Sequence, residues 1–160
     1  YYISIDYGTA NPTSMGLWGR ASGKWYRIRE YYYNSRKVGR QLTDEEYYAE
    51  LEKLAGDLPI RAVIVDPSAA SFIEVIRRHG RFYVEKASNS VLDGIRDVAT
   101  RLQSGDIFIC SCCTDCIREF GLYRWDEKAP MDRPIKENDH AMDEVRYFVH
   151  KVFAPEIFSF

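Results

Sequence analysis

The order of the secondary-structure patterns constrains the fold of this chain more than any other feature of its sequence. Three strand patterns come first, at residues 1–7, 13–20 and 24–34, and only short turns separate them. Ser22-Gly23, between the second and the third, is a typical hairpin turn. Strands this close in sequence pair antiparallel, so the chain predicts a sheet that begins with three antiparallel strands.

After residue 40 the pattern changes to helices that alternate with strands. Thr43 and Glu46 form a capping box that opens a helix ending near Ala55. Residues 61–66 are a nearly unbroken apolar run, typical of a parallel strand covered on both faces. The remaining patterns predict strands at 81–86 and 107–110, and helices at about 69–79, 91–104, 113–122 and 139–153. This order predicts an α/β fold, a ribonuclease H-like mixed central sheet with antiparallel first strands, parallel later strands and helices on both faces.

Length and composition fit one globular domain. The 160 residues are 46% hydrophobic and 29% charged, which is ordinary for a domain with a sizeable core. No apolar run approaches the roughly 20 residues that cross a bilayer, and the N-terminus lacks the features of a signal peptide. Because the chain starts at Tyr1 without an initiator Met, we expect residues 1–160 to be a single domain of a longer protein. Residues 123–138 contain two prolines and mixed charges, and they predict an exposed hairpin or loop.

Three aspartates stand at the ends of predicted elements. Asp6 closes the first strand, Asp66 closes the strand at 61–66, and Asp143 lies in the first turn or so of the last helix. If the two strands lie side by side and parallel, Asp6 and Asp66 meet at the carboxyl edge of the sheet, where α/β sheets bind ligands. Carboxylates so close repel each other, and a divalent cation removes that repulsion. The three residues therefore predict a site for Mg²⁺ or Mn²⁺, with two ions in the arrangement that cuts phosphodiesters.

The last predicted helix supplies a further candidate. His140 lies three residues before Asp143, on the same helical face, where it can position a water or accept a proton. Asp139 is a weaker candidate because it can simply cap the helix. Each of the three aspartates also has an ordinary explanation, as a turn former after a strand or as compensation of the helix dipole. Only their joint placement indicates a metal-dependent nuclease.

Positive charge is concentrated in one stretch of the chain. The formal net charge is −2, yet residues 20–40 contain seven Lys or Arg and one acidic residue, a net charge of +6. Such a stretch can contact phosphates even on an acidic protein, or it can be a solvated strand face and loop. Its DNA-binding candidates are Arg36, Lys37 and Arg40.

Four cysteines lie within seven residues, at Cys110, Cys112, Cys113 and Cys116. Zinc sites usually take their ligands from two separated clusters, and the sequence has no second Cys or His cluster. We therefore expect reduced thiols in a cytoplasmic protein, with a structural metal or a disulfide as the less favoured alternatives.

Several short motifs occur in one order along nearly the whole chain. They are Asp6-Tyr7-Gly8-Thr9 with Asn11-Pro12-Thr13, Gly23-Lys24-Trp25-Tyr26, Glu30-Tyr31-Tyr32-Tyr33, the run from Val65 to Phe72, and Lys136 to Asp143 followed by Arg146-Tyr147-Phe148. The run from Lys136 to Asp143 is the most specific. Together these motifs resemble the nuclease domain in the large terminase subunit of tailed bacteriophages, a ribonuclease H-like domain.

The resemblance implies a DNA endonuclease that cuts concatemeric viral DNA at the start and end of genome packaging. Its metal ligands would be Asp6, Asp66 and Asp143, with His140 as an auxiliary residue and two Mg²⁺ or Mn²⁺ ions as cofactors. Residues 123–138 would be the hairpin beside the active site, with a gating or positioning role because their charges balance. The remaining candidates for DNA contact are Lys86, Asn89, Arg124, Lys128, Arg133 and Lys136.

The resemblance also implies partners. The substrate would be double-stranded DNA in the cytoplasm of the bacterial host, and no membrane would be involved. In the full-length protein the domain would work with an ATPase domain, the portal or prohead and a small terminase subunit. The ATPase's G-x-x-x-x-G-K-[ST] loop does not occur in this sequence, so we expect this chain to cut DNA and not to translocate it.

Three other interpretations stay open. Asp6-x-Gly8-Thr9 also looks like the first phosphate loop of actin-like and sugar-kinase ATPases, although the second loop and the adenosine site of that class are missing. The chain can be a DNA-docking module that is inactive without its ATPase half, which salt-dependent but metal-independent binding would indicate. Another ribonuclease H-like nuclease, a resolvase or transposase, would prefer junctions or RNA–DNA hybrids.

Overall fold

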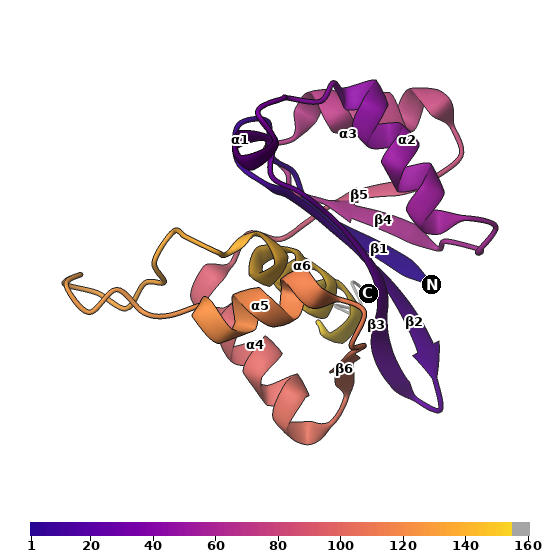
Figure 1. Ribbon diagram of the computed structural model, residues 1–160. Helices are drawn as coiled ribbons and strands as arrows, with labels where there is room; N and C mark the ends of the chain where they lie inside the picture. Colours follow the sequence, from indigo (N-terminus) through magenta and orange to yellow (C-terminus); the bar gives the residue numbers. More distant parts are fainter. Residues whose placement is uncertain (155–160) are drawn as a thin grey trace, which may run out of the picture.

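A six-stranded mixed sheet forms the centre of the computed structural model, which describes residues 1–154 (Figure 1). The strands lie in the order β5-β4-β1-β2-β3-β6. Their bounds are Tyr2–Asp6 (β1), Thr13–Ala21 (β2), Lys24–Tyr33 (β3), Ala62–Val65 (β4), Val84–Lys86 (β5) and Ile107–Ile109 (β6). The first three strands, consecutive in sequence, are thus flanked on both sides by later ones.

The strand directions confirm the predicted fold class. β2 pairs antiparallel with β1 and with β3, whereas β4 pairs parallel with β1, β5 with β4, and β6 with β3. β2 is therefore the one strand of this sheet that runs against the others. The turn between β2 and β3 is the predicted one: Ser22 and Gly23 both have a positive φ, 52° and 76°, a conformation that glycine adopts easily.

Helices cover both faces of the sheet. α2 (Asp44–Ala55) and α3 (Ala70–His79) lie on one face, and α4 (Val91–Ser104), α5 (Thr114–Leu122) and α6 (His140–Phe153) lie on the other (Figure 1). The predicted capping box is present at the start of α2: the Thr43 side chain accepts a hydrogen bond from the Glu46 backbone N–H, and the Glu46 side chain accepts one from the Thr43 backbone N–H. The sequence does not predict α1 (Ser35–Val38), because four residues are too few to show a helical period. Within residues 1–154 no helix has the length and apolar character that crossing a membrane requires.

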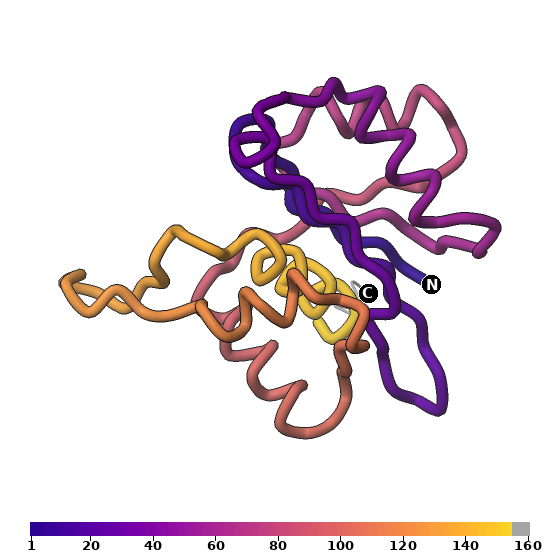
Figure 2. Tube along the Cα trace, viewed as in Figure 1, coloured from indigo at the N-terminus to yellow at the C-terminus, as the bar shows by residue number. Residues whose placement is uncertain are grey.

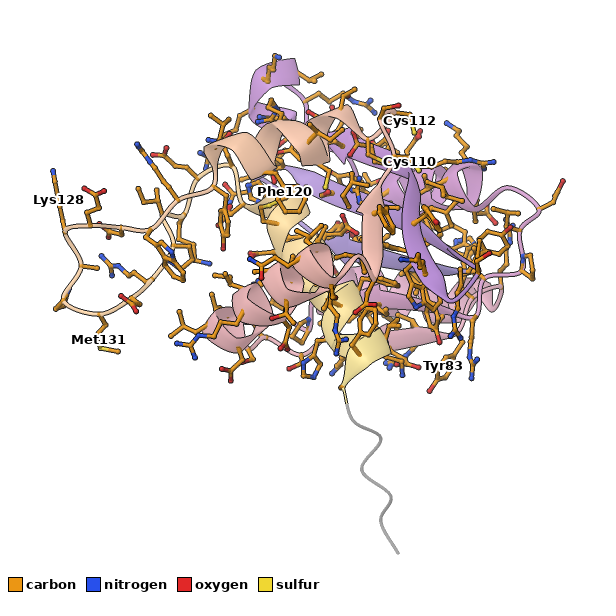
Figure 3. All side chains as sticks on the ribbon, turned by 90° about the horizontal axis from the view of Figure 1, so that it is seen from below. Tyr83, Cys110, Cys112, Phe120, Lys128 and Met131 are labelled. Atoms are coloured by element: carbon orange, nitrogen blue, oxygen red, sulfur yellow. The ribbon has the colours of Figure 1, made fainter. Side chains whose placement is uncertain are left out.

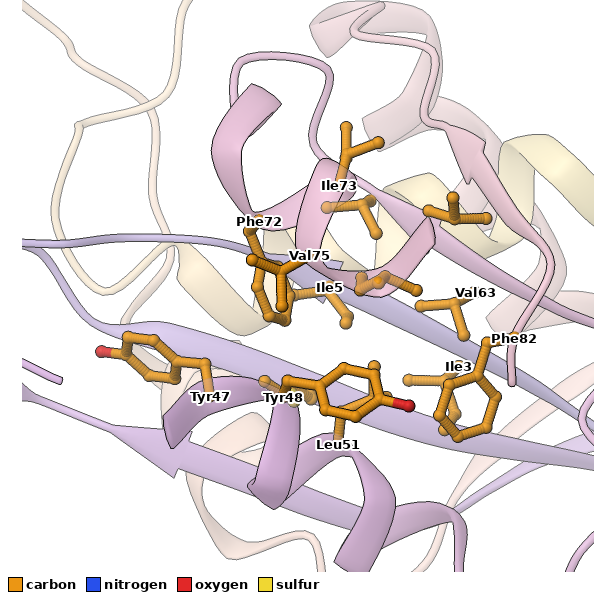
Figure 4. Packing of buried hydrophobic residues seen from close by; sticks show 14 of the residues in the cluster. Ile3, Ile5, Tyr47, Tyr48, Leu51, Val63, Phe72, Ile73, Val75 and Phe82 are labelled. Carbon is orange, nitrogen blue, oxygen red and sulfur yellow. The ribbon is translucent and has the colours of Figure 1, made fainter. Parts of the chain in front are cut away.

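Side-chain alternation along β1 gives the strand one hydrophobic face. Ile3 and Ile5 are fully buried on the side of the sheet that α2 and α3 cover. They belong to a cluster with Leu51 of α2, Phe72 of α3 and Val63 of β4 (Figure 4). Burial of such side chains stabilises a fold by roughly 1.5–3 kcal/mol each, so this cluster holds β1 and β4 against α2 and α3.

The other face of β1 meets α6. Ser4 donates a hydrogen bond to Glu144 of α6, and Asp6, two residues further along the strand, points to the same side. Trp18 of β2 stacks on Phe148 of α6 with ring centroids 3.9 Å apart. β1 therefore buries hydrophobic side chains on one face and presents polar ones to the last helix on the other.

Residues 123–138, which we call the arm, project from the body of the molecule as a narrow loop (Figure 2). Trp125 and Pro134 form an antiparallel bridge across it. Lys128 and Met131 lie at its tip, where Met131 is 76% exposed (Figure 3). The arm follows α5 and leads into α6, so its base lies beside the first residues of α6.

Candidate active site

Asp6 and Asp66 stand at the ends of two neighbouring parallel strands. β1 and β4 pair with Ile5 opposite Val65, and the Asp66 backbone N–H donates to the Ile5 carbonyl at 3.1 Å. Asp66 Oδ1 also accepts from the Ser68 backbone N–H at 2.9 Å, so this residue shapes the turn after β4 as well. Both carboxylates therefore lie at the carboxyl edge of the sheet, as the parallel pairing predicts.

The start of α6 brings two more candidates to the same edge. A hydrogen bond of 2.9 Å joins His140 Nδ1 to Asp6 Oδ2. Asp143 lies one turn later, close enough for its charge to act on Asp6. The structure thus places all four residues that the sequence singled out at one edge of the sheet, and we refer to Asp6, Asp66 and Asp143 as the carboxylate site.

Asp6 is a buried carboxyl group in a negative environment, and its residue is 8% exposed. Burial raises the pKa of Asp6 to about 7; the charges of Asp143 and Asp66 add to the rise, while the hydrogen bond and charge of His140 oppose it. Burial lowers the pKa of His140, but its contact with the Asp6 carboxylate outweighs this and raises the pKa above the usual value. Asp6 therefore binds a proton, or a cation in its place, more readily than an exposed aspartate.

A buried arginine holds Asp143. Arg146, 3% exposed, donates to Asp143 Oδ1 from Nη2 at 2.7 Å and from Nε at 3.2 Å. Its Nη1 donates to the Ser90 carbonyl at 2.9 Å, and Ser90 is the N-cap residue of α4. Arg146 therefore fixes the orientation of the Asp143 carboxylate, offsets part of its charge and connects it to the loop before α4.

One oxygen of each aspartate in the carboxylate site makes no hydrogen bond to the described residues. The bonds above use Oδ2 of Asp6 and Oδ1 of Asp66 and Asp143. Carboxylate oxygens are the ligands that Mg²⁺ and Mn²⁺ prefer, so this set of donors fits a hard divalent cation. Within residues 1–154, however, no three His, Cys, Asp or Glu side chains lie close enough together to form a ready-made metal cluster. The residues suit a cation by their chemistry but are not yet assembled around one position.

The N-terminus of α6 is capped from another helix. Asp139, the N-cap residue, makes no side-chain capping bond. Glu119 of α5 accepts from the backbone N–H groups of Ala141 and Met142, at 2.6 and 3.4 Å, and from the Tyr32 hydroxyl at 2.6 Å. Because Glu119 is fully buried, its interaction with the helix end is little screened by water. α5 thereby positions the turn that contains His140 and Asp143.

A buried ion network lies behind α6. Glu144 accepts from Arg27 Nε at 3.1 Å and from Nη2 at 2.7 Å, and both residues are 0% exposed. Arg27 also donates to Glu30 at 2.7 Å. Glu30 in turn accepts from the backbone N–H groups of Asp115 and Cys116, at the start of α5, at 2.7 and 3.1 Å. These bonds join β3, α5 and α6 into one frame behind the carboxylate site.

Two tyrosines near the site are not among the sequence candidates. Burial raises the pKa of Tyr147, and the charges of Asp6, Asp66 and Asp143 raise it further, so its hydroxyl lies within reach of the charges of all three. Tyr147 is one helical turn after Asp143, a spacing visible in the sequence. The buried Tyr123 hydroxyl has no hydrogen-bond partner among residues 1–154, and no sequence pattern indicates this.

Three of the basic residues predicted to bind DNA lie close to the carboxylate site. Arg36 and Lys37 of α1, and Lys136 of the arm, line one hollow beside it. Arg40, just after α1, is paired with Glu46 and lies outside this hollow.

The other predicted DNA contacts are spread more widely. Lys128 is at the tip of the arm (Figure 3), and Arg133 forms an ion pair of 2.9 Å with an aspartate of the arm itself. Arg124 is exposed at the base of the arm. Lys86 ends β5, and Asn89 lies in the exposed loop that leads to α4. The structure does not gather these residues into one surface with the first group.

The cysteines lie apart from the carboxylate site. All four are free thiols, and Cys110 and Cys112 lie just after β6, at the edge of the sheet (Figure 3). The Cys113 thiol donates to the Arg27 carbonyl at 3.2 Å. Burial raises the pKa of Cys113 to about 12 and raises that of Cys116 as well, so these two thiols are held protonated inside the core.

Comparison with known proteins relates the whole described fold to one group. No protein-family model matches the chain. The large terminase of the thermophilic bacteriophage D6E, solved with ADP, is 51% identical, with a TM-score of 0.92 over 95% of this chain and 39% of that one. The large terminase subunit of Escherichia phage T5 is 24% identical over 157 residues, which are 94% of this chain and 35% of that protein.

A third similarity concerns an isolated domain. The large terminase nuclease from the thermophilic phage G20c, solved with bound magnesium, has a TM-score of 0.73 at 14% identity, over 94% of this chain and 80% of that one. At this identity the similarity is one of fold. The chain thus spans about two fifths or less of the D6E and T5 proteins, but most of the G20c nuclease.

Proposed function

Because this chain corresponds to the nuclease domain of bacteriophage large terminase subunits, we propose that it is a metal-dependent endodeoxyribonuclease. Its reaction would be the hydrolysis of phosphodiester bonds in concatemeric viral DNA during genome packaging. The observation that supports this most strongly is the position of Asp6, Asp66 and Asp143 at one edge of the sheet, each with one oxygen that makes no hydrogen bond within the described part of the chain.

In this proposal the three aspartates would hold Mg²⁺ or Mn²⁺, two ions in the complete site. Bound ions supply the Lewis acidity that activates a water and stabilises the departing 3′ oxygen, leaving 5′-phosphate and 3′-hydroxyl ends. The chain's own side chains would orient the ligands: His140 holds Asp6, and Arg146 holds Asp143. His140 is also placed to accept or relay a proton beside the reacting group.

The wider role follows from the relatives and is part of the same proposal. The substrate would be double-stranded viral DNA in the cytoplasm of the bacterial host. In the full-length protein this domain would act beside an ATPase domain, with a small terminase subunit and the portal of the prohead as partners. The D6E relative was solved with ADP and is longer than this chain, which is consistent with a nucleotide-binding part outside the matched region.

A second candidate function is a DNA-docking module that does not cut alone. The arrangement of the site favours it. Asp143 is bonded to Arg146 and Asp6 to His140, and within residues 1–154 no three potential ligands lie close enough together to surround a metal ion. The ATPase half or DNA itself would then complete the site. This candidate predicts DNA binding without cleavage by the isolated chain.

The deciding experiment is nicking of supercoiled plasmid in EDTA, Mg²⁺ or Mn²⁺. We expect cutting with either ion, none in EDTA, and none with Asp66→Asn. The matched control is Asp57→Asn, an exposed aspartate in the turn after α2, which should cut like the unchanged chain. Binding without cutting in any ion would support the docking module, and neither binding nor cutting by the folded chain would refute both functions.

A further inference from the structure

A large hollow lies beside the carboxylate site. Its volume is about 1040 Å³, and its walls come from α1, the end of β3, α5 and the base of the arm. His140 is one of its lining residues, so the hollow opens directly onto the site that Asp6 and His140 share. In Figure 1, α1 and the arm lie on opposite sides of this end of the sheet.

The hollow is positively charged on a chain that is negative as a whole. Four cations line it, against two acidic residues, Asp115 and Glu137, whereas the formal net charge of the chain is −2. The cations are Arg36, Lys37, Arg118 and Lys136. A positive hollow with low-dielectric walls attracts an anion, and a nuclease substrate presents a row of them.

Arg118 is held in place for such a contact. Its Nη1 donates to Asn138 Oδ1 at 3.1 Å and its Nη2 to Asp115 Oδ1 at 3.3 Å. Its guanidinium also lies over the ring of Tyr32, 5.3 Å from the centroid. The side chain is nevertheless 40% exposed, and a guanidinium has five N–H donors, so Arg118 can also contact a phosphate in the hollow.

The hollow on the other side of the arm differs in character. Its volume is about 710 Å³, and Val91, Leu92, Pro134 and Ile135 give it apolar walls. Its charged residues, two aspartates against one Arg and one Lys, cancel. The two sides of the arm are therefore distinct, and only the α1 side is suited to a polyanion.

We infer that the hollow between α1, α5 and the arm binds the sugar-phosphate backbone of the DNA strand next to the cut. The positioned guanidinium of Arg118 would donate hydrogen bonds to one phosphate. Arg36, Lys37 and Lys136 would contact neighbouring phosphates through more mobile side chains. The inference rests on the proposed function and adds to it the path of the substrate. It also assigns a role to Arg118, which the sequence does not mark as a DNA contact.

The test is the salt dependence of binding to a fluorescent duplex oligonucleotide. Binding is measured in the Asp66→Asn background, so that the duplex stays intact, between about 50 and 200 mM salt. Arg118→Gln and Lys37→Gln should each lower the slope of log Kd against log salt by about 0.9, the value for one phosphate contact. Arg77→Gln, which removes an exposed charge from α3, is the matched control and should leave the slope unchanged.

The outcomes separate this inference from the proposed function. If the variants keep the control slope while the unmutated chain still cuts plasmid in Mg²⁺, the hollow is not the DNA path but the nuclease stands. If the folded Asp66→Asn chain binds no duplex and the unmutated chain does not cut, both fail. Lys37 is exposed on α1, so Lys37→Gln is decisive even if Arg118→Gln disturbs folding.

Discussion

Replacing Asp6 by asparagine is predicted to stabilise the metal-free protein. The Asp6 pKa is about 7 in the folded state and 3.8 in the absence of the protein environment. Above pH 7 the folded chain must keep this carboxyl group charged, against burial and the charges of Asp66 and Asp143. A difference of about three pKa units corresponds to roughly 4 kcal/mol, and this is the upper limit of the increase in the free energy of unfolding when the side chain at position 6 is neutral.

Some of this gain is lost because Asp6 also binds His140, and a protonated histidine prefers a carboxylate to an amide. We therefore expect Asp6→Asn to be more stable by about 2 to 4 kcal/mol in EDTA at pH 8, a rise in Tm of roughly 5–15 °C for a domain of this size. The measurement is thermal unfolding followed by circular dichroism, with Asp57→Asn as the control for loss of an exposed negative charge.

The pH dependence has a defined sign. Between pH 3.8 and about 7 the folded state binds more protons at Asp6 than the unfolded state does, so the unmutated chain gains stability as the pH falls through this range. The advantage of Asp6→Asn should therefore be largest above pH 7 and shrink toward pH 4. Added Mg²⁺ should raise the Tm of the unmutated chain and not that of the variant. Equal Tm values at pH 8 in EDTA, or a difference that does not change with pH, would refute the reasoning.

Three further changes test the frame around the site. Glu119→Ala leaves the buried N–H groups at the start of α6 unpaired, so we expect urea unfolding to show a loss of about 1–3 kcal/mol of stability, together with slower cleavage. Glu119→Gln keeps an acceptor oxygen and should retain most of the stability and most of the cleavage rate. An equal loss in the two variants would contradict the capping role. Arg27→Met leaves the fully buried Glu144 charge without its partner, so a loss of about 3–5 kcal/mol is expected by the same measurement, and a loss below 1 kcal/mol would show that the pair is not needed. A Cβ at Gly8 would collide with the Asn11 carbonyl, so Gly8→Ala must move the loop after Asp6, and titration calorimetry should show weaker Mg²⁺ binding. An unchanged Mg²⁺ affinity would show that this loop does not affect the carboxylate site.

The parts of the fold that local sequence signals determine could be predicted. The capping box at Thr43 and the turn at Ser22 and Gly23 depend on residues only a few positions apart. The apolar run before Asp66 indicates a central strand because a short run that is apolar throughout is typical of a strand covered on both faces. Once that strand is placed beside β1, the meeting of Asp6 and Asp66 follows from the spacing of parallel strands alone.

The arrangement of α6 could not be predicted in the same way, because its partners are distant in sequence. Glu119 accepts a hydrogen bond from the backbone N–H of Ala141, 22 positions away, and Ser4 donates one to Glu144, 140 positions away. Neither a helical period nor a motif indicates such pairs. Asp143 and Arg146 are different, because their spacing of three residues on one helix is a local signal that could have indicated the contact, although we did not predict it from the sequence.

Hydrogen bonding separates the acidic residues of the frame from those of the proposed site. Both carboxylate oxygens are bonded in the buried Glu119 and Glu144, and also in the half-buried Glu30. A buried carboxylate with all its acceptors satisfied is a structural element, and removing its partners destabilises the fold. Among residues 1–154, one oxygen has no hydrogen-bond partner in each of Asp6, Asp66 and Asp143, and Asp6 is buried as well, so its charge is compensated only in part. An incompletely satisfied group of this kind lowers the stability of the metal-free fold, and a divalent cation would reverse that effect. In the metal-free chain the bonded glutamates of the frame therefore stabilise the fold, whereas the carboxylate site destabilises it. This is why we expect neutralising Asp6 to raise Tm and removing Glu119 to lower it.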